Sequence, residues 1–271
     1  MASNAPPFGK NMIRIFIASI ALLLTGCMAT PRERPSDPAT SQVVSDNPIA
    51  AFSTSPAGTI PIQWTPIVIH RNKKKTKYQL VAEHDRAILH ARAVGASSGL
   101  MQHVSIDPLA QPMLNWQWRI GNIIPSADNY QRDAEDSPVR IVLGFDGDKD
   151  SLPFADQILF DTVKLLTGQE IPYATLMYVW ENKAPVGTII PSTRSGRIKM
   201  MVAGSGSEGI GQWHEFTRNI VADYEKAFGE KPGKLIGVGV LTDTDNTGET
   251  VDAWYGDIRS FREREVVVAD K

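Results

Sequence analysis

The chain has 271 residues, of which 42% are hydrophobic, enough for at least one well-filled core. Its 28 basic and 30 acidic residues leave a net charge of −2, which excludes the broad basic surface typical of proteins that bind nucleic acid. Cys27 is its single cysteine, so an intramolecular disulfide is excluded and packing alone must hold the fold together.

A short apolar segment near the beginning predicts an export signal. Arg14 precedes the apolar run 15–24, and the small residues Thr25 and Gly26 lead into Cys27. A secretory signal has this order of a basic region, an apolar region and a cleavage site. A membrane-spanning helix is the alternative interpretation, but it needs about 20 apolar residues, roughly twice the length of this run.

The stretch Leu24-Thr25-Gly26-Cys27 resembles the lipobox of bacterial lipoproteins. The resemblance implies that residues 1–26 are removed as a signal peptide and that Cys27 carries a lipid that anchors the chain to a membrane. It also implies a place in the bacterial cell envelope, and in a Gram-negative host on the periplasmic face or surface of the outer membrane. Residues 27–61 are rich in proline, serine and threonine, and such a composition predicts an extended tether.

Residues 62–271 are expected to form a single domain that is mainly β. The clearest strand is Met113–Ile120, in which apolar residues alternate with Asn115, Gln117 and Arg119. Further strands are predicted at Ile67–His70, Lys77–Ala82, Ala87–Val94, Leu100–Ile106, Val139–Phe145, Thr175–Trp180, Arg197–Val202, Leu235–Thr242 and Ala253–Phe261. Short strands joined by Gly, Pro and Asp favour a β-sandwich or jelly roll over a parallel α/β sheet.

Two short helices are expected within this domain. The first extends from Ser151 to about Leu166, has apolar residues at helical spacing, and ends at Gly168. The second extends from Asn219 to Phe228, buries Ile220, Tyr224 and Phe228, and ends at Gly229. Because there are too few helices to pair with the strands, neither is expected to be a crossover that makes strands parallel.

An acidic segment offers the best metal-ligating pattern. Asp243-x-Asp245-x-Thr247-Gly248 matches the first half of a calcium-binding loop. Trp254 stands where the bidentate glutamate belongs, so an EF-hand is excluded. A structural calcium site is one interpretation, with ligands from Asp243, Asp245, Asn246 and Asp257. A tight turn in which Asp and Asn cap their own backbone is another, and contact with a sugar is a third.

Other polar residues give weaker indications. Asn115, Gln117 and Arg119 share the strand face opposite Trp116 and Trp118, from which planar polar groups could donate to sugar hydroxyls. The basic run 71–77 is expected to be a solvated turn or a patch for phosphate-bearing glycans. The acidic cluster of Asp133, Glu135 and Asp136 is expected to lie in a solvated loop.

Several segments are distinctive when taken together, namely PYATLMYVW at 172–180, Trp213, RNIVADY at 218–224, Phe228-Gly229, TDTDNTG at 242–248 and WYGDI at 254–258. In this order they resemble the bacterial domain-of-unknown-function family 3047 over roughly residues 67–261. The family brings no established activity. Its resemblance to galactose-binding-like jelly rolls implies glycan binding near the aromatic–acid step Tyr255-Gly256-Asp257.

The expected function is non-catalytic binding of a glycan, with Trp254 and Tyr255 near the site and the segment 243–248 shaping it. A scaffold that binds envelope proteins is the first alternative, and an exposed apolar patch would favour it. The second alternative is a glycan hydrolase that uses Asp243 or Asp245 together with Asp257, and it requires two carboxylates about 5 to 9.5 Å apart.

Overall fold

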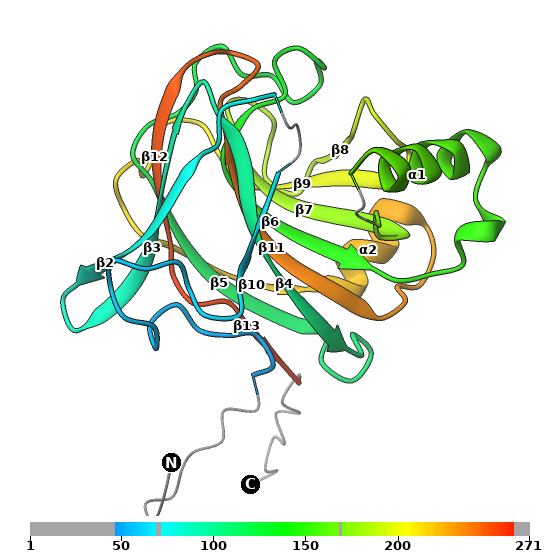
Figure 1. Cartoon of the computed structure of the whole chain (residues 1–271), viewed down its shortest axis with the longest axis horizontal. Helices are drawn as coiled ribbons and strands as arrows, with labels where there is room; N and C mark the ends of the chain where they lie inside the picture. Colours follow the sequence, from blue (N-terminus) through cyan, green and yellow to red (C-terminus); the bar gives the residue numbers. More distant parts are fainter. Residues whose placement is uncertain (1–46, 69–71, 168–169, 263–271) are drawn as a thin grey trace, which may run out of the picture. The chain divides into compact units, whose positions relative to one another are not determined.

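The computed structural model of the protein describes residues 47–68, 72–167 and 170–262 (Figure 1). In this part of the chain two β-sheets pack face to face, accompanied by two α-helices, and the prediction of a β-sandwich with two short helices is confirmed. The predicted signal peptide, Cys27 and most of the predicted tether lie outside the described residues. Neither described helix is long and apolar enough to cross a membrane.

The larger sheet has seven strands. In spatial order these are β1 (Thr65–Ile67), β4 (Ser97–Ile106), β11 (Leu235–Asp243), β6 (Ser137–Phe145), β7 (Ala174–Glu181), β9 (Ile198–Ser205) and β8 (Ile189–Pro191). Its neighbouring strands are antiparallel except for β7 and β9, which are parallel. The parallel pair needs no helical crossover, because β8 reverses the chain between them and pairs antiparallel with β9.

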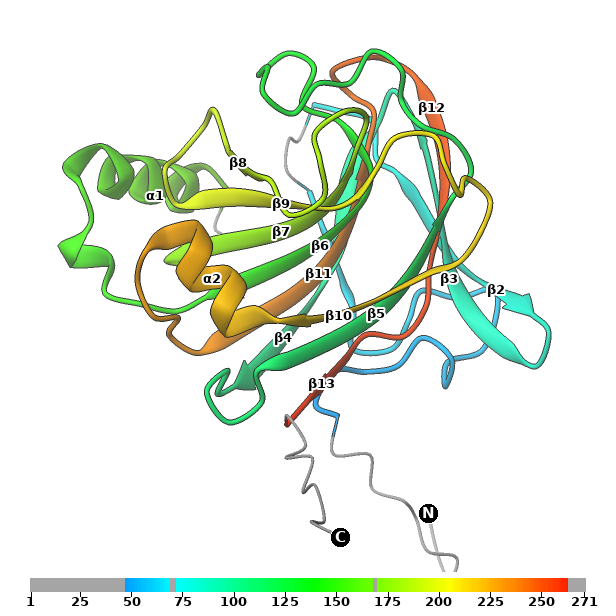
Figure 2. The ribbon, with the colours of Figure 1, turned by 180° about the vertical axis from the view of Figure 1, so that it is seen from behind.

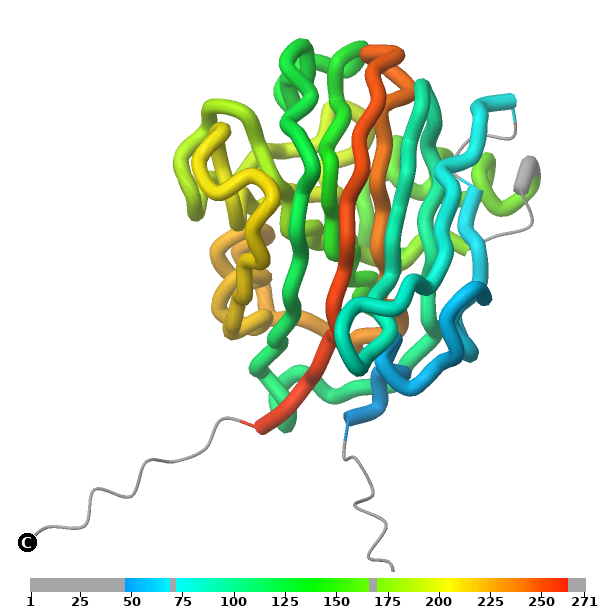
Figure 3. Tube along the Cα trace, turned by 90° about the vertical axis from the view of Figure 1, so that its left-hand side faces the viewer, coloured from blue at the N-terminus to red at the C-terminus, as the bar shows by residue number. Residues whose placement is uncertain are grey.

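The smaller sheet is shown face-on in Figure 3, with β12 in red between β5 and β3. Its spatial order is β10 (His214–Asn219), β5 (Met113–Ile120), β12 (Thr250–Tyr255), β3 (Arg86–Val94) and β2 (Lys77–Glu83), and β13 (Arg259–Phe261) also pairs with β5. The strand predicted at Ala253–Phe261 is therefore two strands. Gly256 lies between them and donates its N–H to the carbonyl of Gln117 at 2.9 Å.

The core between the sheets is aromatic. Trp116 and Trp118 of β5 are fully buried, as the alternation predicts, and Trp116 stacks on Tyr178 and Phe216 at centroid distances of 4.6 and 5.2 Å. The two indole Nε1 atoms have no hydrogen-bond partner among the described residues, so these rings contribute through apolar burial and ring packing. Rings of this size stabilise the fold by about 1.5–3 kcal/mol each.

Helix α2 (Ile220–Phe228) follows β10 directly and closes one side of the core (Figure 2). The Asn219 side chain accepts hydrogen bonds from the N–H groups of Val221 and Ala222, both at 3.1 Å, and so caps the first turn. Gly229 ends the helix in a left-handed conformation at φ 74°. Ile220 and Tyr224 are buried as predicted.

Helix α1 (Phe154–Thr167) departs from its prediction. It begins after the 3₁₀ turn η1 (Lys149–Ser151), so Ser151 belongs to that turn rather than to the α-helical cap. Its spaced apolar residues face outward, with Phe154 75% and Leu165 85% exposed, whereas Phe160 is buried. The predicted stop at Gly168 lies outside the described residues.

The segment 47–61 packs on the sandwich, although the sequence assigns it to the tether. Ile49 and Phe52 are buried, and Phe52 meets Trp64 at a ring-centroid distance of 4.8 Å. The Trp64 indole donates to the carbonyl of Ala50 at 3.0 Å, and the Asn47 side chain binds the backbone at Ile258 and Ser260. The packed domain therefore begins at Asn47 or earlier, because the apolar side chains of this segment are buried against the sandwich.

Candidate functional site

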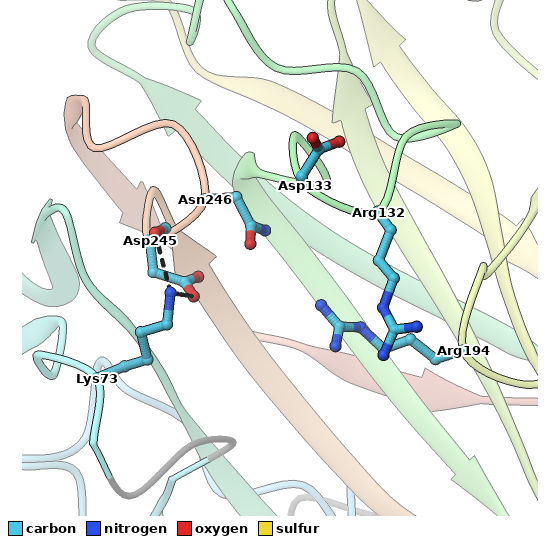
Figure 4. Close-up of a pocket in the computed structure, with 6 residues that line it drawn as sticks. All are labelled: Lys73, Arg132, Asp133, Arg194, Asp245 and Asn246. Atoms are coloured by element: carbon cyan, nitrogen blue, oxygen red, sulfur yellow. Dashed lines mark hydrogen bonds and ion pairs between the residues drawn. The ribbon is translucent and has the colours of Figure 1, made fainter.

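A cavity of about 540 Å³ opens where four loops meet at one end of the strands of the larger sheet. It is lined by residues from the segment before β2, the β5–β6 loop, the β8–β9 loop and the β11–β12 turn, namely Lys73, Arg132, Asp133, Arg194, Asp245 and Asn246 (Figure 4). All six side chains are charged or carry an amide. Its volume is in the range of small-ligand sites.

A smaller cavity of about 120 Å³ adjoins the first and reaches into the sheet. The two share Arg194, Asp245 and Asn246, and the smaller one adds Arg140 and Asp243 among its lining residues. Asp243 is the last residue of β11, and Arg140 lies on the neighbouring strand β6. The pairing of these two strands therefore places a carboxylate and a guanidinium side by side beneath the larger cavity.

Arg140 and Asp243 form a buried ion pair. The guanidinium Nε donates to Asp243 Oδ1 at 3.2 Å, and the side chains are 3% and 9% exposed. Arg140 also donates to the side chain of Asn129 and to the carbonyl of Glu135. Burial penalises the Asp243 carboxylate more than Arg140 stabilises it, and nearby Asp136 adds repulsion, so the pKa of Asp243 rises from 3.8 to about 6.

The β11–β12 turn is fixed by a residue from another loop. Asp136 accepts hydrogen bonds from the backbone and side chains of Asn246 and Thr247, with the two from Thr247 at 2.8 Å. Gly248 closes the turn at φ 75°, and its N–H donates to the carbonyl of Thr244 at 2.9 Å. The predicted tight turn is present, but its carboxylate cap comes from Asp136, which is buried rather than solvated as the sequence predicted.

A calcium ion fits these residues poorly. One carboxylate oxygen from each of Asp136, Asp243 and Asp245 lies within 4.8 Å of the others. Calcium takes six to eight oxygen ligands, however, and Arg140 and Lys73 already pair with Asp243 and Asp245 at 3.2 Å. Asp257, the predicted fourth ligand, is engaged elsewhere, because its carboxylate binds the backbone and hydroxyl of Ser53. The predicted hydrolytic pair would require these hydrogen bonds to release the Asp257 carboxylate.

The predicted sugar-binding residues lie on a different surface, the outer face of the smaller sheet. Trp254 stands there between two neighbours, stacked on His90 at a centroid distance of 5.1 Å and covered on β5 by the Arg119 guanidinium at 4.3 Å. A pyranose ring therefore finds no open ring face on Trp254. Arg119 itself is held by Glu83 at 2.7 Å, and Asn115 by Glu215 at 2.9 Å.

The same surface includes Trp213. Its indole donates to Glu83 at 2.7 Å, and Arg119 lies over its ring at 4.9 Å. Burial opposes ionisation of Glu83, but the hydrogen bonds from Trp213 and Arg119 prevail and lower its pKa. Gln117 stands in the same row and accepts from Arg86 at 3.4 Å. These contacts satisfy one another, which is typical of a structural ladder across a sheet.

Tyr255 is a core residue, which corrects its prediction as a ligand contact. Its side chain is fully buried, and its hydroxyl donates to the carbonyl of Leu241 and meets the Thr242 hydroxyl, both at 2.8 Å. Sequence reasoning missed Arg132, Arg140 and Arg194, because they lie far from residues 243–248 along the chain. The run of charge at 71–77 did mark Lys73, which pairs with Asp245.

Comparison with solved structures returns β-sandwich proteins at low similarity. A β-1,2-glucanase from Parabacteroides distasonis shares 12% identity at a TM-score of 0.36, over 83% of this chain and 26% of that protein, so the chain spans about a quarter of its length. The endo-1,4-β-glucanase CelB2 shares 11% identity at a TM-score of 0.40, over 80% and 99%. The xyloglucanase domain of NopAA from Sinorhizobium fredii, in complex with cellobiose, shares 7% identity at a TM-score of 0.35, over 79% and 92%.

At these TM-scores the similarities say nothing about the activity of this chain. No curated protein matches its sequence. The profile of one family matches residues 62–259, which is most of the chain and nearly all of the described sandwich. The chain therefore belongs to the family described as "Protein of unknown function (DUF3047)".

Proposed function

We propose that this protein is a lipid-anchored protein of the bacterial cell envelope that binds a glycan without cleaving it, in the cavity between the β11–β12 turn and the β5–β6 and β8–β9 loops. The observation that carries the proposal is the lining of that cavity, which consists entirely of charged and amide side chains. Such groups match the closely spaced donors and acceptors of a polyhydroxylated ligand. A purely apolar ligand would leave them unpaired.

The loops around the cavity are held in place without a ligand. Within the β5–β6 loop, the Asp128 N–H donates to the carbonyl of Ala134 at 2.9 Å, and the Asp128 carboxylate accepts from Tyr130 and Gln131. Asp136 fixes the opposite turn through Asn246 and Thr247. A site whose walls are already ordered loses less conformational entropy when it binds a ligand.

The test is binding of the full chain to an array of bacterial-envelope and plant glycans, compared with two variants. Asp245→Asn alters the cavity, whereas Gln117→Ala alters the outer face of the smaller sheet. We expect saturable binding that the first variant weakens and the second leaves unchanged. The opposite pattern would move the site to the smaller sheet, and an array without binding would overturn the glycan proposal.

Lipid anchoring needs its own experiment, because residues 1–46 lie outside the described part of the chain. We expect incorporation of labelled palmitate in growing bacteria and its loss in Cys27→Ser. Labelling of the variant at the wild-type level would contradict the anchor.

A scaffold role is the second candidate, favoured by the exposed apolar residues Phe154, Ile158 and Leu165 of α1. Hydrolysis is favoured by Asp243, since a carboxyl group with a pKa of about 6 suits a general acid. Experiments can distinguish the scaffold role and hydrolysis from glycan binding. Release of shorter sugars from a bound glycan would show hydrolysis, and capture of a defined envelope protein that depends on Leu165 would favour the scaffold.

A further inference from the structure

The distribution of charge within the larger cavity points to a more specific ligand. Three cationic side chains line it, and one of them, Lys73, already pairs with the Asp245 carboxylate at 3.2 Å. The other two are arginines from different loops, Arg132 and Arg194. Figure 4 shows both arginine side chains extending into the same part of the cavity, while the Asp133 carboxylate points away from them.

Neither arginine is well paired. Arg132 makes no ion pair or hydrogen bond with any described residue, and the nearest carboxylate contact of Arg194 is to Glu135, with Nε 4.0 Å from Oε2. Arg194 does hold its own loop, since its backbone N–H donates to the Ser192 hydroxyl at 3.2 Å. Two guanidinium groups thus share one open space, and no carboxylate of the described residues lies closer than 4.0 Å to either of them.

An anion bound between the two guanidinium groups would neutralise their mutual repulsion. Like charges that share a cavity repel, and the repulsion grows as solvent is displaced by a ligand. A guanidinium presents paired N–H donors that match a carboxylate or phosphate, and such charge-assisted hydrogen bonds are about twice as strong as neutral ones. A neutral sugar would desolvate both arginines without neutralising either.

We infer that the ligand of this cavity is an anionic glycan, whose carboxylate or phosphate substituent binds between Arg132 and Arg194 while the sugar contacts Asn246. This inference rests on the proposed glycan binding and adds the chemical class of the ligand. Lys73 and Asp245 lie on the side of the cavity opposite the arginines and pair with each other, so the anionic substituent binds to the two arginines.

The experiment uses matched acidic and neutral ligands with the full chain. Trigalacturonate differs from its methyl ester in the carboxylate charge and by small ester methyl groups, and mannose 6-phosphate differs from mannose only in the phosphate. Dissociation constants are measured for wild type, Arg132→Gln, Arg194→Gln and the control Arg86→Gln, which removes an exposed arginine from the smaller sheet. Thermal unfolding of each variant checks that it is folded.

We expect at least one acidic ligand to bind about tenfold more tightly than its neutral partner. Each cavity variant should remove most of that preference and leave the affinity for the neutral ligand unchanged, and Arg86→Gln should behave as wild type. Whichever pair shows the effect identifies the anion as a carboxylate or a phosphate.

The failures of the two proposals are distinguishable. Equal binding of acidic and neutral sugars, weakened by Asp245→Asn, would overturn the anionic inference and leave glycan binding intact. Binding of inorganic phosphate that requires both arginines, with no binding of any sugar, would support the anion site and overturn the glycan. An acidic preference that persists in both arginine variants would overturn the assignment to this cavity.

Discussion

The stability of the fold should depend on pH through Asp243. Because burial raises the pKa of this carboxyl from 3.8 to about 6, the folded chain binds a proton here that the unfolded chain releases between those pH values. The contribution of Asp243 to stability is therefore fully present below pH 3.8 and is lost as the pH rises through about 6. Between pH 5 and pH 7.5 the loss amounts to about 1.4 kcal/mol.

Asp243→Asn removes this titration and keeps the shape of the side chain. The free energy of unfolding, measured by urea denaturation at pH 5 and pH 7.5, should show wild type gaining about 1.4 kcal/mol over the variant at the lower pH. Comparison with the variant cancels groups that titrate in both proteins. Asp85→Asn, which removes an exposed carboxylate from the β2–β3 turn, is the matched control and should follow wild type at both pH values.

An unchanged difference between wild type and Asp243→Asn would refute this reasoning. If the ion pair with Arg140 outweighed burial, the pKa of Asp243 would lie below 3.8, and the carboxyl would be ionised in both the folded and the unfolded chain at pH 5 and at pH 7.5. The stability difference would then be nearly the same at the two pH values, and wild type would lose stability relative to the variant only below about pH 4. Asp243 would in that case lose its suitability as a general acid.

Three further changes test other features of the fold. Phe52→Ala should lower the free energy of unfolding by about 3–5 kcal/mol, whereas the exposed Ile62→Ala should have little effect; equal effects would show that the segment 47–61 is not part of the packed domain. Asn219→Ala should cost about 1 kcal/mol through the lost cap of α2, and a neutral result in the same urea assay would contradict the capping role. The melting temperature should be the same in calcium as in magnesium. An increase that only calcium produces would show that the ion displaces Arg140 and Lys73 from the carboxylates of Asp243 and Asp245.

Local sequence patterns predicted the elements whose interactions are local. Alternation placed Trp116 and Trp118 of β5 in the core, and the cap residues Asn219 and Gly229 marked the ends of α2. Strand β10 escaped prediction, because Phe216 is its single apolar residue and one apolar side chain cannot give an alternating pattern. The exposure of the apolar residues of α1 could not be predicted either. Their spacing shows that they lie on one face of the helix, but not whether another element packs on that face.

The candidate site was only half predictable, because its residues meet through sheet topology. The spacing of Asp243 and Asp245 identified the β11–β12 turn, but its partners Arg140 and Asp136 lie more than 100 residues earlier and arrive through β6, the neighbour of β11. Trp254 shows the same limit. The sequence predicts that Trp254 lies near a sugar site, whereas the strand register places His90 and Arg119 against the two sides of its ring.

The described chain begins and ends on the same side of the sandwich. Asn47 and β13 are joined there by hydrogen bonds, and both ends of the described chain lie at this end (Figure 3). The β11–β12 turn and the loops around the cavity lie at the opposite end (Figure 1). The entrance of the cavity is therefore remote from both ends of the described chain, and neither of them obstructs a ligand on its way in.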